Sequence, residues 1–409
     1  MDAFELQLPG FEALVEHGRA RLIAGARRAL AHAGARVPID ALPDGALLDP
    51  RVHAFAYWPG APIPIEQVLV GLLPAAARPA AVRVVADGDG VVHLPGLGCA
   101  IGLPPAASAT LLCSGTRASI EGATWQPPTR LPGGAELATR VDPSWQRVLL
   151  HDAPAHDLEL EASAARHRGT IERALGWLRA LDRDYFAELS RDLRLLVVFR
   201  SDRVGSRTNL SAHGAAFLHC EPDASAPFFC EDLAHQVGHL TFYAVTADPR
   251  RCFRIPPRTP IARVGGPAWD HRSLYDALHG NFTIVRMVQV LGALLDRVAL
   301  SPLERAETVG RLALALDRLE RGLDSIDDPR LFTPEIWALH GVMRDFAVAM
   351  RRRHGARIEH ADLGEQPYTF SWATYRRRNH VTVHADPERT GGGVVLPRPH
   401  RVSVRARAS

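Results

Sequence analysis

Residues 228–245 read FFCEDLAHQVGHLTFYAV, a stretch with an apolar helical pattern. Its apolar side chains return at intervals close to those of one helix face, at Phe229, Leu233, Val237 and Leu240. His235 and His239 lie one turn apart in this stretch, and side chains at i and i+4 share a helix face. A helix chelates a transition metal with two imidazoles placed in this way. The sequence therefore predicts an apolar helix that supplies two metal ligands.

The residue between the two histidines decides which chemistry the motif supports. In the H-E-x-x-H motif of zinc proteases, the glutamate is the general base. Here that position is Gln236, and an amide does not take a proton from metal-bound water. The motif therefore retains the two metal-binding histidines and lacks the general base that hydrolysis needs. This predicts a metal enzyme that needs no base at this position, with Fe(II)/O2 oxidation as the leading candidate.

A second pair with the same spacing, His380 and His384, has a different context. The surrounding NHVTVHADP alternates in polarity like a strand and is followed by the turn-rich DPERTGGG. We therefore place the metal pair at His235 and His239 instead.

A catalytic metal needs a third protein ligand, and His279 is the best candidate. It lies 40 residues after His239, in LYDALHGNF on the next predicted helix. Ligands of helical metal sites converge from facing helices, and Gly280 beside it is expected to let the two backbones approach closely.

Three carboxylates are alternatives to His279 as the third ligand. Asp276 precedes it by three residues and shares its face, and Asp270 lies just before the helix. Glu231 lies one turn before His235, where a straight helix rarely wraps a third ligand around one ion. We expect Glu231 to orient an imidazole N–H from beside the site.

Arg272 is the candidate anchor for an acidic cosubstrate. A guanidinium binds a carboxylate bidentately, as a 2-oxo acid requires. The alternative role of Arg272 is a surface ion pair. Trp269 and Tyr275 are expected to form an apolar pocket wall around the site, although core packing explains them equally well.

Composition excludes several classes of protein. All 48 basic residues are Arg, so Schiff-base chemistry and the Walker A phosphate loop are excluded. A net charge of +3 gives no case for a nucleic-acid partner. The five cysteines form no C-x-x-C pair, there is no signal-peptide pattern, and no apolar run reaches the roughly 18 residues of a membrane span. The cytoplasm is the expected compartment.

The pattern along the chain predicts an α+β fold in three parts. Residues 1–160 hold an amphipathic helix (1–35), a loop-rich stretch (36–80) and β-like runs VRVVAD, GVVHLPG, ATLLCSG and RVLLHD. This β-rich module is a scaffold or a substrate-recognition unit. Residues 161–385 form a mainly helical metal-binding domain that includes a buried strand at 192–199 and ends in a β-like segment from 368. Residues 386–409 are expected to be a flexible Arg-rich tail.

The order of these motifs resembles a known family. HQVGH (235–239), DHRSL (270–274) and LHG (278–280) follow one another as in the HExxH-motif peptide-modification proteins of ribosomal-peptide gene clusters. That resemblance implies Fe(II)- and 2-oxoglutarate-dependent β-hydroxylation of a residue in a precursor peptide. It further implies that His235, His239 and His279 hold iron and that Arg272 binds the cosubstrate.

Two other functions remain open on the sequence. The first is a zinc metallopeptidase-like hydrolase with another base, such as Glu231. The second is a non-catalytic, degenerate metallopeptidase-like scaffold that binds peptides. Gln236 argues against the hydrolase, because the general base of that motif is missing.

Overall fold

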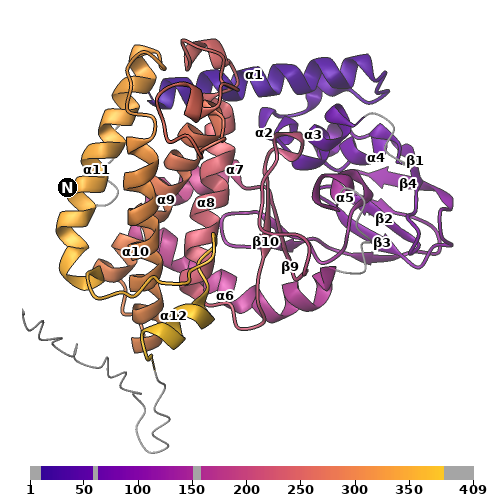
Figure 1. The fold of residues 1–409 in the computed structure, drawn as a ribbon. Coiled ribbons are helices and arrows are strands. Elements are labelled where there is room, and N and C mark those ends of the chain that lie inside the picture. The colour runs from indigo at the N-terminus through magenta and orange to yellow at the C-terminus, as the bar shows by residue number, and fades with distance from the viewer. Residues whose placement is uncertain (1–10, 59–62, 151–157, 382–409) are drawn as a thin grey trace, which may run out of the picture.

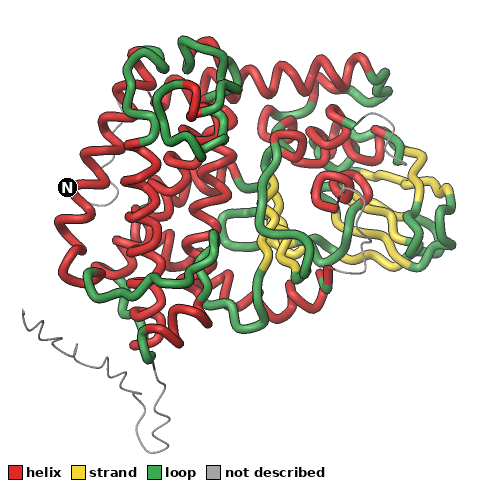
Figure 2. The backbone as a smooth tube through the Cα atoms, in the orientation of Figure 1, coloured by secondary structure: helices red, strands yellow, loops and turns green. Residues whose placement is uncertain are grey.

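The computed structural model of the chain describes residues 11–58, 63–150 and 158–381. Its fold is α+β, which confirms the predicted class. Strands gather in one half of the molecule and long helices fill the other half (Figure 1, Figure 2).

The helical body is built around α9. Its helices are α1 (Phe11–His32), α6 (Leu160–Leu181), α7 (Arg183–Asp192), α8 (Ala226–Val245), α9 (Leu274–Arg297), α10 (Pro302–Asp324) and α11 (Pro334–Ile358). Helix α9 packs against both α8 and α10. It is long and apolar enough to cross a membrane by composition, but 78% of its apolar stretch is buried inside the protein, as in a core helix.

Polar caps set where these helices begin. Ser273 and Asp276 form a reciprocal capping box at the start of α9. Helix α6 ends at Leu181 and α7 begins at Arg183, because the Asp182 carboxylate accepts the amide of Tyr185 at 2.7 Å and caps a new helix.

The strands form three small sheets. Two are antiparallel, with the orders β1-β4-β5 and β2-β3-β6, and the third has the order β10-β9-β8-β7. Their bounds are β1 (Ala81–Val85), β2 (Val91–Leu94), β3 (Gly98–Ile101), β4 (Ser108–Ser114), β5 (Arg117–Ser119), β6 (Thr124–Gln126), β7 (Thr129–Arg130), β8 (Glu136–Leu137), β9 (Leu195–Phe199) and β10 (Ala215–His219). The strand predicted at 192–199 is therefore present as β9.

The third sheet crosses the boundary expected at residue 160. Strands β7 and β8 precede that point, yet β8 pairs in parallel with β9, which follows it. Helix α1 also comes from the first predicted part and packs on α8 of the second. Residues before and after position 160 therefore contribute strands to the same sheet and helices that pack against each other.

Two stretches before residue 160 differ from the expected pattern. The stretch 36–80 is not only loop but holds short helices, namely η1 (Ile39–Ala41), α2 (Asp44–Leu47), α3 (Pro50–Tyr57), α4 (Ile65–Leu69) and η2 (Ala75–Ala77). RVLLHD, expected as a strand, begins inside helix α5 (Pro143–Leu150). Trp145, Val148 and Leu149 are buried at helical spacing, which a short apolar run does not distinguish from a strand.

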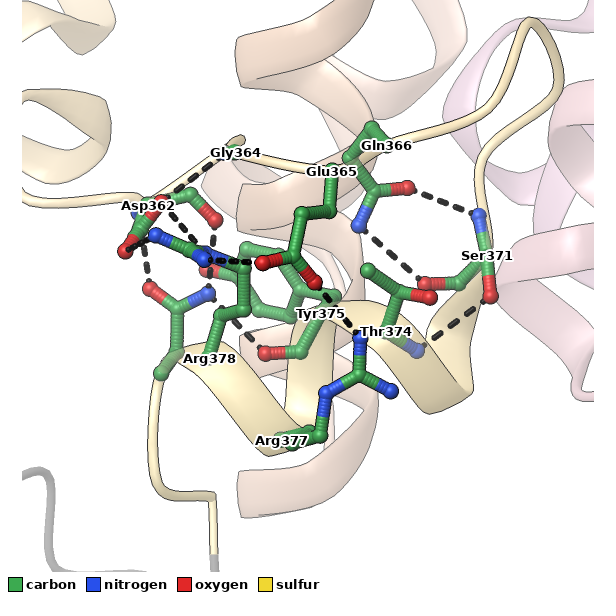
Figure 3. Close-up of polar contacts among 10 residues, drawn as sticks. Asp362, Gly364, Glu365, Gln366, Ser371, Thr374, Tyr375, Arg377 and Arg378 are labelled. Atoms are coloured by element: carbon green, nitrogen blue, oxygen red, sulfur yellow. Dashed lines mark hydrogen bonds and ion pairs between the residues drawn. The ribbon is translucent and has the colours of Figure 1, made fainter.

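The β-like segment expected from residue 368 is instead helix α12 (Trp372–Arg378) (Figure 3). The Ser371 hydroxyl caps it by accepting the amide of Thr374 at 3.2 Å. Arg378 then pairs with Asp362 at 2.9 Å and with Glu365 at 2.8 Å, which holds the helix against the preceding loop. His384 and the predicted tail at 386–409 lie outside the described residues.

Helix α1 reaches α8 through a glycine and a buried polar cluster. A Cβ atom at Gly18 would overlap the carbonyl of Ala244, so the two backbones touch. The Arg19 guanidinium donates to Asp192 of α7 at 2.5 Å, and the Thr241 hydroxyl of α8 donates to the same carboxylate at 2.8 Å. This contact ties the N-terminal helix to the helix that carries the histidine pair.

We expect Gly18→Ala to lower the free energy of unfolding by about 1–3 kcal/mol, because the new methyl group meets backbone that does not move aside. Gly25→Ala on the same helix is the matched control, since nothing lies within 4 Å of its Cβ position. That control should gain up to about 1 kcal/mol from helix propensity. Chemical denaturation measures both, and equal stability of the two variants would contradict the close contact.

Candidate metal centre

Helices α8 and α9 bring the three predicted histidines together. His239 Nε2 lies 3.1 Å from His235 Nε2, one turn earlier on α8. His239 Nδ1 lies 2.8 Å from His279 Nε2 on α9. The imidazoles thus form a continuous cluster drawn from two facing helices, as the sequence predicts.

The nitrogens of this cluster form a chain of contacts. His239 turns a different nitrogen to each neighbour. As the side chains stand, no group of three or more His, Cys, Asp and Glu among the described residues surrounds a position fit for a metal ion. Imidazole nitrogens are donors that transition metals take, so the residue types suit a metal, although these three side chains do not enclose one as they stand.

Burial keeps His239 and His279 uncharged. Desolvation lowers the pKa of His239 well below its ordinary value, and the neighbouring His235 and His279 lower it further. Desolvation, followed by the charge of His235, lowers the pKa of His279 to about 3. Neutral imidazoles with free lone pairs are the form of histidine that binds metals.

Asp232 is the carboxylate at the cluster, and sequence reasoning missed it. Its Oδ1 lies 3.7 Å from His235 Nδ1, and it accepts hydrogen bonds from Ser206 at 2.7 Å and Gln236 at 3.0 Å. Burial would raise the pKa of Asp232, but His235, Gln236 and Ser206 outweigh burial and hold it below its usual value. An ionised carboxylate facing Nδ1 favours the tautomer that leaves the lone pair on Nε2.

Glu231 does not occupy the position predicted for it. Its carboxylate forms a buried ion pair with Arg311 of α10, which also binds Glu307 at 2.8 Å. Glu231 therefore connects α8 to α10, and Asp232 faces the imidazole. Residues three and four positions before His235 share its helix face, so spacing alone does not separate the two acids.

The other two carboxylates considered as ligands have local partners. Asp276 accepts the Ser273 hydroxyl at 2.6 Å within the capping box and is exposed. Asp270 is buried and accepts Arg272 at 3.0 Å and 2.7 Å, and this hydrogen bonding lowers the pKa of Asp270. Arg272 is thus in the ion pair that the sequence left as its alternative role, with its side chain 46% exposed.

Aromatic rings surround His279. Phe242 stacks on it with ring centroids 4.8 Å apart, while Tyr243 and Tyr275 meet it edge-on at 5.0 Å and 5.3 Å. Tyr275 thus contacts the cluster as expected, whereas Trp269 is 77% exposed and forms no such wall. The rings leave His279 only 5% exposed, so the α9 ligand lies in a water-poor setting.

The close approach of the two helices occurs at Gly238, not at the predicted Gly280. A Cβ at Gly238 would lie 3.3 Å from Arg286 Cγ and 3.4 Å from Thr283 Cα, whereas nothing lies within 4 Å of that position at Gly280. Gly238 is next to His239, and Thr283 is one turn after His279. The small residue therefore lies on α8, beside the ligands.

Two cavities lie away from this cluster, and none of the three imidazoles lines them. One, of about 190 Å³, is lined by residues that include Asp49, Arg51 and Arg194. The other, of about 30 Å³, is lined by residues of the β-rich module that include His93 and Cys99. Neither cavity is the apolar pocket expected at the histidines.

No protein-family model matches the chain, and no curated protein is similar to it in sequence. The family resemblance of the HQVGH, DHRSL and LHG motifs thus rests on those residues alone.

The buried histidines predict a loss of stability in acid. An unfolded histidine takes up a proton below about pH 6.5. In the folded protein the pKa of His279 is lowered to about 3, so this side chain stays neutral at any higher pH. The unfolded chain therefore binds more protons in this window, so stability present at neutral pH is lost as the pH falls.

In metal-free protein, replacing His279 by Phe should remove about 2 kcal/mol of the loss of unfolding free energy between pH 7 and pH 5. His271→Phe, at an exposed position of the preceding loop, is the matched control. Denaturant titrations at several pH values measure the effect. Parallel pH profiles for wild type and His279→Phe would show that the buried imidazole is not held neutral.

Proposed function

We propose that the chain is a metal-dependent oxygenase that uses Fe(II) and 2-oxoglutarate to hydroxylate a side-chain β-carbon in a ribosomally made precursor peptide. The observation that carries this proposal is the gathering of His235, His239 and His279, with contacts of 2.8 Å and 3.1 Å across two helices. A three-imidazole set with no base between the histidines suits redox chemistry better than hydrolysis. The cytoplasm is the proposed compartment, supported by five free thiols.

The residues around the cluster have distinct tasks in this proposal. His235, His239 and His279 would hold the iron, which together with the oxo acid and O2 would supply the oxidising chemistry. Asp232 orients His235 from its Nδ1 side, and Gln236 holds Asp232 with a hydrogen bond of 3.0 Å. The rings of Tyr243 and Tyr275 exclude water from the α9 side.

To bind the cosubstrate, Arg272 would have to exchange its present partner, Asp270, for the carboxylate of the oxo acid. Its guanidinium is occupied by Asp270, with contacts of 3.0 Å and 2.7 Å. The half-exposed side chain leaves room for a second carboxylate to share or replace this pair. A bidentate carboxylate from the oxo acid would make the same hydrogen bonds that Asp270 makes.

The two other functions have less support. A zinc hydrolase needs a base, but Glu231 is paired with Arg311 and Asp232 faces the ring nitrogen that points away from His239. A peptide-binding scaffold needs no metal ligands, so that reading leaves the gathering of His235, His239 and His279 without a function. Both are outcomes of the experiment that follows.

Anaerobic, Fe(II)-loaded protein titrated with 2-oxoglutarate should develop a visible charge-transfer band. His235→Ala, His239→Ala and His279→Ala should each abolish the band, whereas His271→Ala at the exposed loop position should keep it. No band despite firmly bound metal would remove the cosubstrate from the proposal. Peptide cleavage with Zn(II) and no oxo acid would establish the hydrolase, and failure to retain stoichiometric metal would favour the scaffold.

Arg272→Gln should raise the 2-oxoglutarate concentration for half-saturation of that band by at least about tenfold, since a charge-assisted bidentate contact is worth about 1.5–3 kcal/mol. Arg330→Gln is the matched control, because Arg330 forms the same i, i+2 ion pair with Asp328 at 3.0 Å and 2.7 Å. Equal half-saturation for the two variants would exclude Arg272 as the anchor.

A further inference from the structure

The β2–β3 hairpin places a cysteine, a histidine and an aspartate in contact, outside the helical body. Cys99 and His93 are directly opposite each other in the antiparallel pair. The Cys99 Sγ lies 3.7 Å from His93 Nδ1, and His93 Nε2 lies 2.8 Å from Asp87 Oδ2. A nucleophile, a base and a group that orients the base are thus connected in series, the arrangement of nucleophilic catalysis.

Backbone hydrogen bonds hold the aspartate in place. Asp87 Oδ1 accepts the amides of Asp89 and Val91, both at 2.9 Å, in the turn between β1 and β2. The other oxygen is left for His93 Nε2. Because the carboxylate fixes Nε2, the ring presents Nδ1 to the thiol. The orientation of His93 is therefore set by the turn and not by the cysteine.

The charges around His93 favour its protonated form. Burial alone would lower the pKa of His93, but the hydrogen bond to Asp87, the contact with Cys99 and the charge of Asp142 raise it to about 10. At neutral pH an imidazolium therefore lies beside the Cys99 sulfur, where it is placed to give its proton to a leaving group. Further charged groups line the same cavity, namely Arg51, Glu136 and Arg140.

A small cavity opens at the thiol. It measures about 30 Å³, and Cys99, His93, Gly98 and Gln126 are among its lining residues. Cys99 itself is partly exposed, so reagents reach it from solvent. A space of this size holds roughly two water-sized groups, so only a short acyl group would fit beside the thiol.

The other cysteines lack this setting. Burial raises the pKa of Cys220 and Cys252 to about 12, and it also raises the pKa of Cys230. Cys113 is partly exposed in the same β-rich module, but burial raises its pKa, and the only charge that lowers it is that of Arg78. Cys113 is therefore an internal reference for a thiol of this module without a histidine.

We propose that Cys99, His93 and Asp87 form a nucleophilic thiol site that accepts a short acyl group from an ester or thioester. The Cys99 thiolate attacks the carbonyl carbon, the bond to the leaving oxygen or sulfur breaks, and His93 gives its proton to that leaving group. Water, deprotonated by the now neutral His93, then attacks the resulting thioester, the carbon–sulfur bond breaks, and the carboxylic acid leaves, which restores the Cys99 thiolate and the protonated His93. The site is independent of the histidine cluster on α8 and α9.

Alkylation rates test the activated thiol. With iodoacetamide at pH 6, mass spectrometry should show Cys99 labelled at least about tenfold faster than Cys113, because the thiolate is the reacting form. His93→Gln should remove that difference. The Cys113 rate also reports whether the module stays folded, since unfolding would accelerate it. Equal rates in the wild type, or an unchanged ratio in a folded His93→Gln protein, would overturn the proposal.

Acyl transfer is tested with p-nitrophenyl acetate. The wild type should release a burst of p-nitrophenolate stoichiometric with protein and carry an acetyl group on the peptide that contains Cys99. Cys99→Ala should lose the burst, while Cys113→Ala keeps it. Fast alkylation of Cys99 without a burst would mean that His93 and Asp87 only stabilise the hairpin. That result would contradict the proposed acyl transfer.

Discussion

The proposed function depends on the direct packing of α8 against α9. A Cβ atom at Gly238 would lie 3.4 Å from Thr283 Cα and 3.3 Å from Arg286 Cγ, so little more than a methyl group fits between the two helices at this point. At this helix spacing, Nδ1 of His239, the residue after Gly238, lies 2.8 Å from Nε2 of His279, which is one turn before Thr283. A larger residue at Gly238 would increase the separation of the helices and part the imidazoles. The candidate ligand set is therefore a consequence of backbone spacing as much as of the histidines themselves.

The gathering of three adjacent bases needs a physical reason. Burial lowers the pKa of His239 and of His279, and neighbouring imidazoles lower both further. A neutral imidazole donates through one nitrogen and accepts through the other, so His239 links its neighbours only as donor to one and acceptor from the other. A core of apolar side chains would fill the same space without these constraints. A cation that takes up the lone pairs, as proposed above, would explain why the chain retains three histidines there.

The sequence predicts the histidine cluster well, because helical phase determines which side chains share a face and an apolar pattern marks both helices. It does not separate Glu231 from Asp232, since offsets of three and four residues are equivalent on a helix surface. The pairing of β8 with β9 was not predicted, because strands distant along the chain carry no local signal of their partner. Helices α5 and α12 were misread as strands because short apolar or aromatic runs fit both periods.

The hydrogen-bond network that orients His235 also explains why residue 236 is a glutamine. Its amide nitrogen donates to Asp232, which already faces His235 and accepts the Ser206 hydroxyl. A glutamate at this position has no proton to donate at neutral pH and would bring a second carboxylate against a buried one, which raises the cost of keeping both ionised. The presence of an amide at Gln236 therefore depends on the presence of a carboxylate at Asp232. A change from Gln to Glu alone would not create a hydrolytic base here, because it would first break the contact that holds Asp232 against the imidazole. The chemistry that this local structure supports is one in which the protein positions ligands and leaves proton abstraction from water out of the site.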